Sequence, residues 1–385
     1  MSKEFLIGNE IIVKAARAAG AEIMFGYPIT PTTEIMSYWT KISEKDENDQ
    51  IKFLQAEDEM AAGFAMIGAV LGGKKAFTAT SGPGNILMQD PMSMAEAMRL
   101  PTVTFIMQRG GPSTGTVIYS QQELILTSHG GNGEGMRIVY APATLQELYD
   151  LSIKAFDTAW RYRFPTFILG DGYLARMQGE VKIWNPEERR IELTPATPYL
   201  GEGKDISLIK KFQSTKSFVV NPVRCLLSNG VKKNYAGVPH RETGAWVNLR
   251  NCFNLEEEIL QVNMDIKKAF DQITSKISEY ETYNCEKVEK IIIAYGIVAA
   301  AVKQAIRETK IKNIGLFRPI TLNPFPKEEA RKIAQKTKKI YILESSLGQF
   351  ASMVKENLYG LTTPIEEHGK PGVGFTPEEI EKIIF

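Results

Sequence analysis

Between residue 8 and about residue 175, short apolar runs of β type alternate with amphipathic or small-residue helical runs. Strands that read as continuous apolar runs, separated by helices, are typical of a parallel sheet covered on both faces. The expected strands are Ala21–Phe25, Ile51–Leu54, Lys75–Thr80, Thr102–Gln108, Arg137–Tyr140 and Pro165–Leu169. The expected helices are Asn9–Ala19, Thr33–Lys41, Asp58–Leu71, Asn85–Met98 and Thr144–Tyr162. The pattern therefore predicts an α/β fold.

A second, smaller α/β unit is expected near the C-terminus. Its strands are Lys290–Tyr295, Ile314–Phe317 and Lys339–Leu343, and its helices are Val298–Glu308, Lys327–Thr337 and Gly348–Leu358. The sequence between the two units favours a linker with extended segments, followed by a connecting helix over Leu255–Tyr283. A chain of 385 residues is long for one hydrophobic core. We predict domains at 1–199 and 286–385, joined by residues 200–285.

Composition excludes several classes of protein. The net charge of +1 gives no electrostatic reason to expect binding to nucleic acid or to an anionic membrane. No apolar run approaches the ~20 residues that a membrane span needs. Cys225, Cys252 and Cys285 are isolated and odd in number, so they predict neither a disulfide framework nor a metal cluster. A cytoplasmic protein without metal ligands of its own is the expectation.

Glycine-, proline- and threonine-rich segments follow three of the predicted strands, at Gly26–Thr33, Thr80–Asn85 and Arg109–Thr116. Ligands of open parallel sheets bind outside the carboxyl ends of the strands. In the first segment two prolines stiffen the loop, which would hold the Thr30 hydroxyl in a fixed direction. The sequence therefore predicts a binding site at this edge of the sheet.

A fourth segment places acidic residues between a predicted strand and an Ala/Gly-rich helix. Glu59 is followed after eight residues by Gly68, and a poorly solvated carboxylate at such a helix start shares a proton only with a specific partner. Glu57 and Asp58 compete with Glu59 for this role. We favour Glu59 because of its spacing to Gly68 and because the helix face at Ala62, Phe64 and Ala65 is expected to be packed.

Together, Tyr27–Pro31, Glu59 with Gly68, Thr80–Gly84 and Arg109–Gly115 resemble the α subunit of a 2-oxoacid:ferredoxin oxidoreductase. The resemblance covers residues 8 to about 175 and continues into residues 290–360 through Arg318–Pro326. It implies a thiamine-diphosphate-binding parallel-sheet domain of the pyrimidine type, followed by a smaller, transketolase C-terminal-like α/β domain. Residues 200–285 match this family poorly, so the resemblance implies nothing about them.

The resemblance also implies roles for individual residues. Glu59 would contact the aminopyrimidine of the cofactor and act in catalysis with Thr30 and Arg109. The implied cofactor-binding residues are Glu59, Pro28, Ser81, Gly82, Gly84 and Asn85. The implied substrate-binding residues are Thr30, Arg109, Ser113 and Thr114. An arginine in this position would pair its planar donor fork with a substrate carboxylate.

Partner chains are implied as well. Gly170-Asp171-Gly172 resembles the start of a Mg²⁺–diphosphate signature, but Asn185 follows too soon and Asn221 too late, so we interpret it as a turn. The diphosphate and Mg²⁺ site is therefore expected on a β subunit. Iron–sulfur (4Fe–4S) clusters are expected on partner chains, among them γ and ferredoxin-like δ subunits. Ferredoxin would be the acceptor, coenzyme A the co-substrate, and the assembly a dimer of heteromers.

The substrate and the class of protein leave alternatives. The segment Arg109–Gly115 most resembles the members of the family that act on 2-oxoglutarate, whereas Thr116–His129 departs from them. Pyruvate or a branched-chain 2-oxoacid therefore stays open. A non-catalytic α/β assembly subunit would keep the same fold, because fold alone does not establish function. A nucleotide-dependent dehydrogenase is disfavoured, because Gly26–Pro31 lacks the Gly-x-Gly-x-x-Gly fingerprint.

Overall fold

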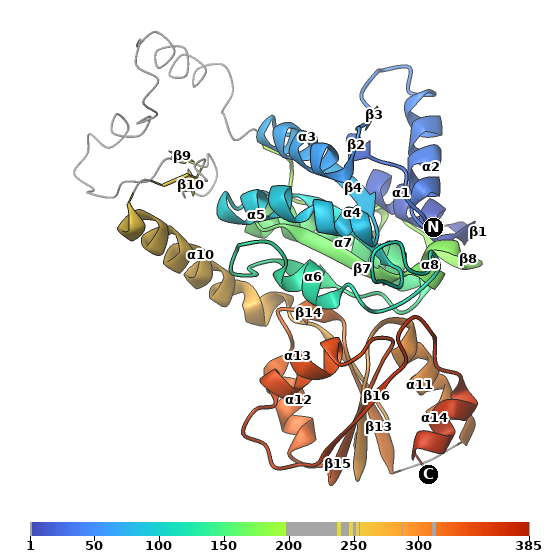
Figure 1. Ribbon diagram of the computed structural model, residues 1–385. Coiled ribbons are helices and arrows are strands. Elements are labelled where there is room, and N and C mark those ends of the chain that lie inside the picture. Colours follow the sequence, from blue (N-terminus) through green and yellow to red (C-terminus); the bar gives the residue numbers. More distant parts are fainter. Residues whose placement is uncertain are drawn as a thin grey trace.

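A seven-stranded sheet with helices on both faces dominates the N-terminal half of the computed structural model (Figure 1). The structure describes residues 2–197, 237–239, 246–248, 252–253, 255–286, 288–309 and 313–384. The strand order is β14-β6-β7-β5-β4-β2-β3, and only β14 is antiparallel to its neighbour. The strands are β2 (Ile23–Gly26), β3 (Lys52–Gln55), β4 (Ala76–Thr80), β5 (Val103–Gln108), β6 (Ile138–Tyr140), β7 (Thr166–Asp171) and β14 (Thr321–Asn323).

Helices cover both faces of this sheet. One apolar layer contains α1 (Gly8–Ala18), α2 (Thr33–Ser43) and α7 (Leu145–Tyr162), and the other contains α3 (Glu59–Leu71) and α5 (Gln89–Ala97). Because the central strands are enclosed on both sides, every residue of β4, β5 and β7 is buried. This burial explains why these strands read as continuous apolar runs, and it confirms the predicted parallel sheet.

The helix expected over Asn85–Met98 is wrong in one respect, because the chain forms two helices there. Helix α4 (Pro83–Leu87) ends before α5 begins at Gln89. Pro91 lies in the first turn of α5. Proline has no N–H to donate to the carbonyl four residues earlier, so a continuous helix through this position is unfavourable.

The C-terminal sheet has five strands in the order β11-β13-β12-β15-β16, and only β11 is antiparallel. Its strands are β11 (Tyr280–Tyr283), β12 (Lys290–Ile293), β13 (Ile314–Pro319), β15 (Lys339–Glu344) and β16 (Ile365–Gly369). Its helices are α11 (Gly296–Thr309), α12 (Lys327–Ala334), α13 (Gln349–Asn357) and α14 (Pro377–Ile384). The second α/β unit is thus confirmed.

The segment between the two sheets differs from its prediction at two points. Strand β8 (Gln178–Ile183) pairs antiparallel with β1 (Ser2–Ile7), which the sequence pattern does not reveal. The long helix α10 (Glu256–Ile277) ends six residues earlier than expected, because the chain continues into β11. Short strands β9 (Gly237–Pro239) and β10 (Trp246–Asn248) also pair. Most of the predicted linker lies outside the described residues, and the domain limits stay a prediction.

The two sheets are joined by the segment that starts at Arg318. Strand β14, which follows β13 of the C-terminal sheet, pairs with β6 of the N-terminal sheet. Arg318 is only 2% exposed, and its Nη1 and Nη2 donate to the Glu147 carboxylate at 2.7 and 2.6 Å. Its Nε lies 3.1 Å from Glu281 Oε2. Glu147 belongs to the first unit and Glu281 to the second, so this arginine ties the two units together.

The Gly170-Asp171-Gly172 segment forms a second contact between the two units. Asp171 is the buried last residue of β7, and α8 (Gly172–Arg176) begins directly after it. The Asp171 carboxylate accepts a hydrogen bond of 2.6 Å from the Ile297 N–H in the first turn of α11. A Cβ at Gly296 would lie 2.1 Å from Asp171 Oδ2. The segment is therefore a strand-to-helix junction that contacts the second unit, and not a simple turn.

The substitution Asp171→Asn should change how stability depends on pH. Burial raises the pKa of Asp171 from 3.8 to about 7. The stability that comes from holding this carboxyl protonated is present below about pH 4 and is lost as the pH rises toward about 7. Asparagine keeps an acceptor oxygen and does not ionise. We expect the Tm of the variant relative to wild type to be higher at pH 8 than at pH 5, and an unchanged difference would contradict this.

Candidate active site

Glu59 lies at the carboxyl edge of the N-terminal sheet, where α3 begins. Its side chain is 4% exposed, and its Oε1 accepts a long hydrogen bond of 3.5 Å from Thr80 Oγ1. Gly84 lies directly against this pair, because a Cβ there would be 2.0 Å from Thr80 Oγ1 and 2.3 Å from Glu59 Oε1. The carboxylate therefore rests on the backbone of the first turn of α4, and only glycine leaves room for it.

The neighbouring acids are used differently. Asp58 caps α3, since its side chain accepts a hydrogen bond of 2.7 Å from the Ala61 N–H. Glu57 is exposed. Burial raises the pKa of Glu59, and hydrogen bonding to Thr80 and the charge of Arg109 oppose this rise. Of the three acids, Glu59 alone is buried, as expected of a carboxyl group that shares a proton with a specific partner.

Arg109 brings three strand ends together. It follows β5 directly and is 5% exposed, and its Nη1 donates to the Thr30 carbonyl at 2.8 Å. A Cβ at Gly82 would lie 2.7 Å from Arg109 Nε, so the guanidinium lies against the β4–α4 turn. The segments after β2, β4 and β5 thus meet, as expected from the sequence. Thr30 contributes its carbonyl to this contact, not its hydroxyl.

The other predicted cofactor residues differ in what they leave accessible. Ser81 is fully buried, and its Oγ has no hydrogen-bond partner among the described residues. Asn85 is also fully buried, but its Nδ2 donates to Glu123 Oε2 at 2.9 Å and to Thr127 Oγ1 at 3.0 Å. Its Oδ1 accepts from Gln89 Nε2 at 2.9 Å. The Asn85 side chain is therefore occupied within the protein. Pro28 is exposed.

Ser113 and Thr114 lie farther out, in an exposed turn that follows Arg109. Ser113 has a φ of +55°, and a Cβ at Gly115 would lie 1.6 Å from the Gly110 carbonyl oxygen. The turn is therefore tight. It leaves both hydroxyl side chains on the surface, so the structure does not gather them with Glu59.

Sequence reasoning missed two residues of this region. Thr80, the partner of Glu59, is the first residue of the Thr80–Gly84 motif, so the sequence carries a signal for it. Glu123 is buried before α6 (Leu124–His129), and its Oε1 accepts from the N–H groups of Gly82 at 2.9 Å and Arg109 at 3.0 Å. Burial raises the pKa of Glu123, and these two donors oppose the rise. No motif marks this acid.

An apolar surface borders the Glu59 region. Ala62 of α3 is fully buried, but Phe64 is 38% exposed, so the expectation of a packed face is confirmed at Ala62 and wrong at Phe64. Met60 on the same helix and Ile86 and Leu87 on α4 are also exposed. None of the described residues lies within 4 Å of the position that a Cβ at Gly68 would take. The outer face of α3 and α4 is thus apolar, and no described part of the chain covers it.

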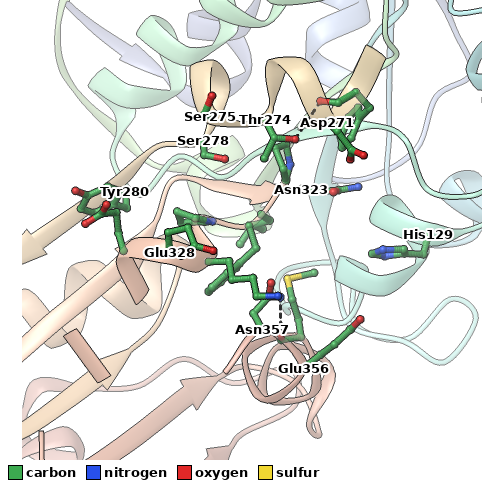
Figure 2. Close-up of a pocket in the computed structure, with 18 residues that line it drawn as sticks. His129, Asp271, Thr274, Ser275, Ser278, Tyr280, Asn323, Glu328, Glu356 and Asn357 are labelled. Carbon is green, nitrogen blue, oxygen red and sulfur yellow. Dashed lines mark hydrogen bonds between the residues drawn. The ribbon is translucent and has the colours of Figure 1, made fainter. Parts of the chain in front are cut away.

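A cleft of about 620 Å³ lies elsewhere, between α10, α12 and α13 (Figure 2). Asp271 and Thr274 of α10, Glu356 and Asn357 of α13 and His129 of α6 contribute to its lining. None of the lining residues belongs to the predicted site. The cleft is therefore separate from the region around Glu59.

Within the described residues, no group of three or more His, Cys, Asp or Glu side chains is arranged to hold a metal ion. Cys252 and Cys285 are free thiols, and burial raises the pKa of Cys285. None of the helices in the described part of the chain is long and apolar enough to cross a membrane.

Comparisons with known proteins agree with this arrangement. Residues 14–244 match the family model for the thiamine diphosphate-binding domain of pyruvate flavodoxin/ferredoxin oxidoreductase. Residues 288–380 match the model for core domain II of pyruvate:ferredoxin oxidoreductase. The chain is 31% identical to the 2-oxoglutarate synthase subunit KorA of Methanocaldococcus jannaschii, over 100% of both chains. It is also 31% identical to the ketoisovalerate oxidoreductase subunit VorB of Methanothermobacter marburgensis, over 92% of this chain and 90% of that one.

Two solved structures are similar to this chain. A 2-oxoglutarate:ferredoxin oxidoreductase from Magnetococcus marinus, with 2-oxoglutarate, coenzyme A and succinyl-CoA bound, has a TM-score of 0.78 and 25% identity. The comparison covers 99% of this chain and 64% of that longer one. A split-gene transketolase, an inactive β4 tetramer, shares the fold alone, with a TM-score of 0.54 and 13% identity.

The fold is thus that of a thiamine diphosphate-binding α/β enzyme chain with a second, transketolase C-terminal-like domain. The chain belongs to the 2-oxoacid:ferredoxin oxidoreductase family, where it corresponds to the α subunit.

Proposed function

We propose that this chain supplies the aminopyrimidine side of a thiamine diphosphate site in a complex that oxidatively decarboxylates 2-oxoglutarate. Coenzyme A would accept the acyl group, CO₂ would be released, and electrons would pass through iron–sulfur clusters on partner chains to ferredoxin. One observation carries this proposal: a buried carboxylate, that of Glu59, is fitted against Gly84 at the edge of the sheet.

The residues at this edge fit such a cofactor. The Ser81 hydroxyl and Arg109 Nε are buried and have no hydrogen-bond partner among the described residues. Buried polar atoms without partners are costly, and a bound ligand can satisfy them. When bound, thiamine diphosphate supplies the electron sink that makes decarboxylation of a 2-oxoacid feasible. Glu59, Pro28, Ser81, Gly82 and Gly84 would hold its pyrimidine side.

The roles of this chain's residues follow from their chemistry. Glu59 would hold and return a proton at the aminopyrimidine ring nitrogen, a task that its raised pKa favours. Arg109 would bind a substrate carboxylate, and the Thr30 hydroxyl would donate a hydrogen bond to a substrate oxygen. Asn85 would support the site from behind, because both ends of its amide are bonded to other side chains.

The choice of substrate rests on the relatives. A relative named 2-oxoglutarate synthase subunit matches this chain over its full length. Arg109 can pair with the one carboxylate that every 2-oxoacid carries, so it does not select among them. A branched-chain 2-oxoacid is the second candidate, because a ketoisovalerate oxidoreductase subunit is equally similar.

The site needs a partner to be complete. We propose that a β subunit carrying the diphosphate and Mg²⁺ binds the apolar face formed by Met60, Phe64, Ile86 and Leu87, which lies next to Glu59. Exposed apolar patches of this kind mark protein interfaces. We further propose that the complex contains γ and δ subunits and assembles as a dimer of these heteromers.

An anaerobic assay of the co-purified complex tests this function. We expect coenzyme A-dependent reduction of a viologen dye with 2-oxoglutarate, and rates at least about tenfold lower with pyruvate and 2-oxoisovalerate, the range that pocket contacts can supply. A preference for 2-oxoisovalerate would overturn the substrate alone. No turnover of any 2-oxoacid by an intact complex loaded with cofactor would overturn the reaction and favour a non-catalytic assembly subunit.

A further inference from the structure

The Glu123 carboxylate connects the segments that carry the proposed site. It is 4% exposed, and one of its oxygens accepts from the backbone N–H groups of Gly82 and Arg109 at 2.9 and 3.0 Å. The other oxygen accepts from Asn85 Nδ2 at 2.9 Å. Three donors from two strand ends and one helix therefore converge on a single side chain.

These donors belong to two neighbouring strands. Gly82 lies in the turn after β4, with φ +53° and ψ −119°, and Arg109 directly follows β5. The Arg109 guanidinium lies against Gly82, where a Cβ would be 2.7 Å from its Nε. The same guanidinium reaches the Thr30 carbonyl beyond β2. A shift of the turn after β4 must therefore shift the arginine as well.

We propose that Glu123 is a positioning residue, which fixes Arg109 and the Ser81–Gly84 turn in the geometry that receives the 2-oxoacid. The proposal rests on the proposed function and adds to it a residue that touches neither cofactor nor substrate. Glu123 acts through Arg109. It accepts a hydrogen bond from the backbone N–H of Arg109 and leaves the Arg109 side chain available.

The chemistry of the three donors requires a carboxylate. Two backbone N–H groups and one side-chain amide all present hydrogens, and an ionised carboxylate is an acceptor at both oxygens. Glutamine has nearly the same shape, but its NH₂ group would face at least one of these donors. A buried donor left without its acceptor costs free energy, and the chain would move to relieve it.

Glu96 offers a matched control within the same buried network. From Asn85 the hydrogen bonds continue to Gln89, then to Arg137, and end at Glu96. Glu96 is 3% exposed and accepts from the N–H groups of Glu134 and Met136 at 2.8 and 3.2 Å. It is thus a buried carboxylate that receives two backbone donors, but these belong to a loop that carries no proposed site residue.

The test compares Glu123→Gln and Glu96→Gln in the complete complex, by steady-state kinetics and by thermal unfolding. Both variants should unfold at lower temperature. Glu123→Gln should lower kcat/KM for the 2-oxoacid about tenfold or more, mainly through KM, whereas Glu96→Gln should stay within about twofold of wild type. Combined with Arg109→Lys, Glu123→Gln should add little further loss, since it acts through that residue.

Several results would overturn the proposal. Equal kinetics of the two glutamine variants would make Glu123 merely structural, and full additivity with Arg109→Lys would show that it does not act through the arginine. If Glu123→Gln does not fold, Glu123→Asp replaces it, because the shorter side chain keeps the carboxyl group but cannot reach all three donors; wild-type KM would then refute the proposal. Failure of the wild-type complex on every 2-oxoacid would instead refute the proposed function.

Discussion

Glu59→Gln should lower kcat of the assembled complex about 100- to 10,000-fold, the range typical of a lost general acid–base group. Glutamine keeps the shape of the side chain and can still accept from Thr80, but it cannot release and regain a proton. The loss should appear in kcat more than in KM for the 2-oxoacid, because Glu59 would contact the cofactor and not the substrate.

The control for this prediction lies two residues away. Glu57→Gln makes the same chemical change at an exposed position, so its kinetics should remain within about twofold of wild type. Both variants should be compared as complexes of unchanged subunit composition and thiamine diphosphate content. Retained turnover in Glu59→Gln, or an equal loss in Glu57→Gln, would remove Glu59 from the catalytic role.

Much of the fold could be predicted because its central strands are enclosed on both faces. The buried strands β4, β5 and β7 appear in the sequence as apolar runs, and the loops after them carry glycine, proline and threonine. The carboxyl ends of parallel strands must meet at one edge, so the proximity of Thr30 and Arg109 followed from topology alone.

The missed elements depend on contacts between distant parts of the chain. Strand β14 has only three residues, and its partner β6 lies about 180 positions earlier in the sequence. Strand β11 continues directly from the amphipathic helix α10, so no loop signal separated them. Local periodicity cannot reveal such pairings.

The unpredicted parts of the site have a related cause. Glu123 belongs to no motif, and its importance is visible only where the backbone donors of Gly82 and Arg109 converge on it. The exposure of Phe64 could not be inferred either, because an apolar helix face reads the same whether it packs within the chain or against a partner.

The substitution Gly84→Ala should reduce activity about 100-fold, although it adds a single methyl group. That methyl would lie 2.0 Å from Thr80 Oγ1 and 2.3 Å from Glu59 Oε1, so both side chains must move. Overpacking of this kind also costs about 1–3 kcal/mol of stability. The φ of Gly84 is not positive, so backbone strain does not contribute to the effect.

Gly68→Ala provides the comparison, because no residue that the structure describes lies within 4 Å of the Cβ position at Gly68. In the interior of α3 this change should leave the isolated subunit as stable as wild type or more stable, by up to about 1 kcal/mol. Thermal unfolding and turnover of both variants separate the two effects. If Gly84→Ala retains wild-type turnover, the close approach of Glu59 to this turn is not needed for catalysis. If Gly68→Ala alone weakens subunit association, the open space at Gly68 is filled by the partner, which would place the β subunit on the outer face of α3.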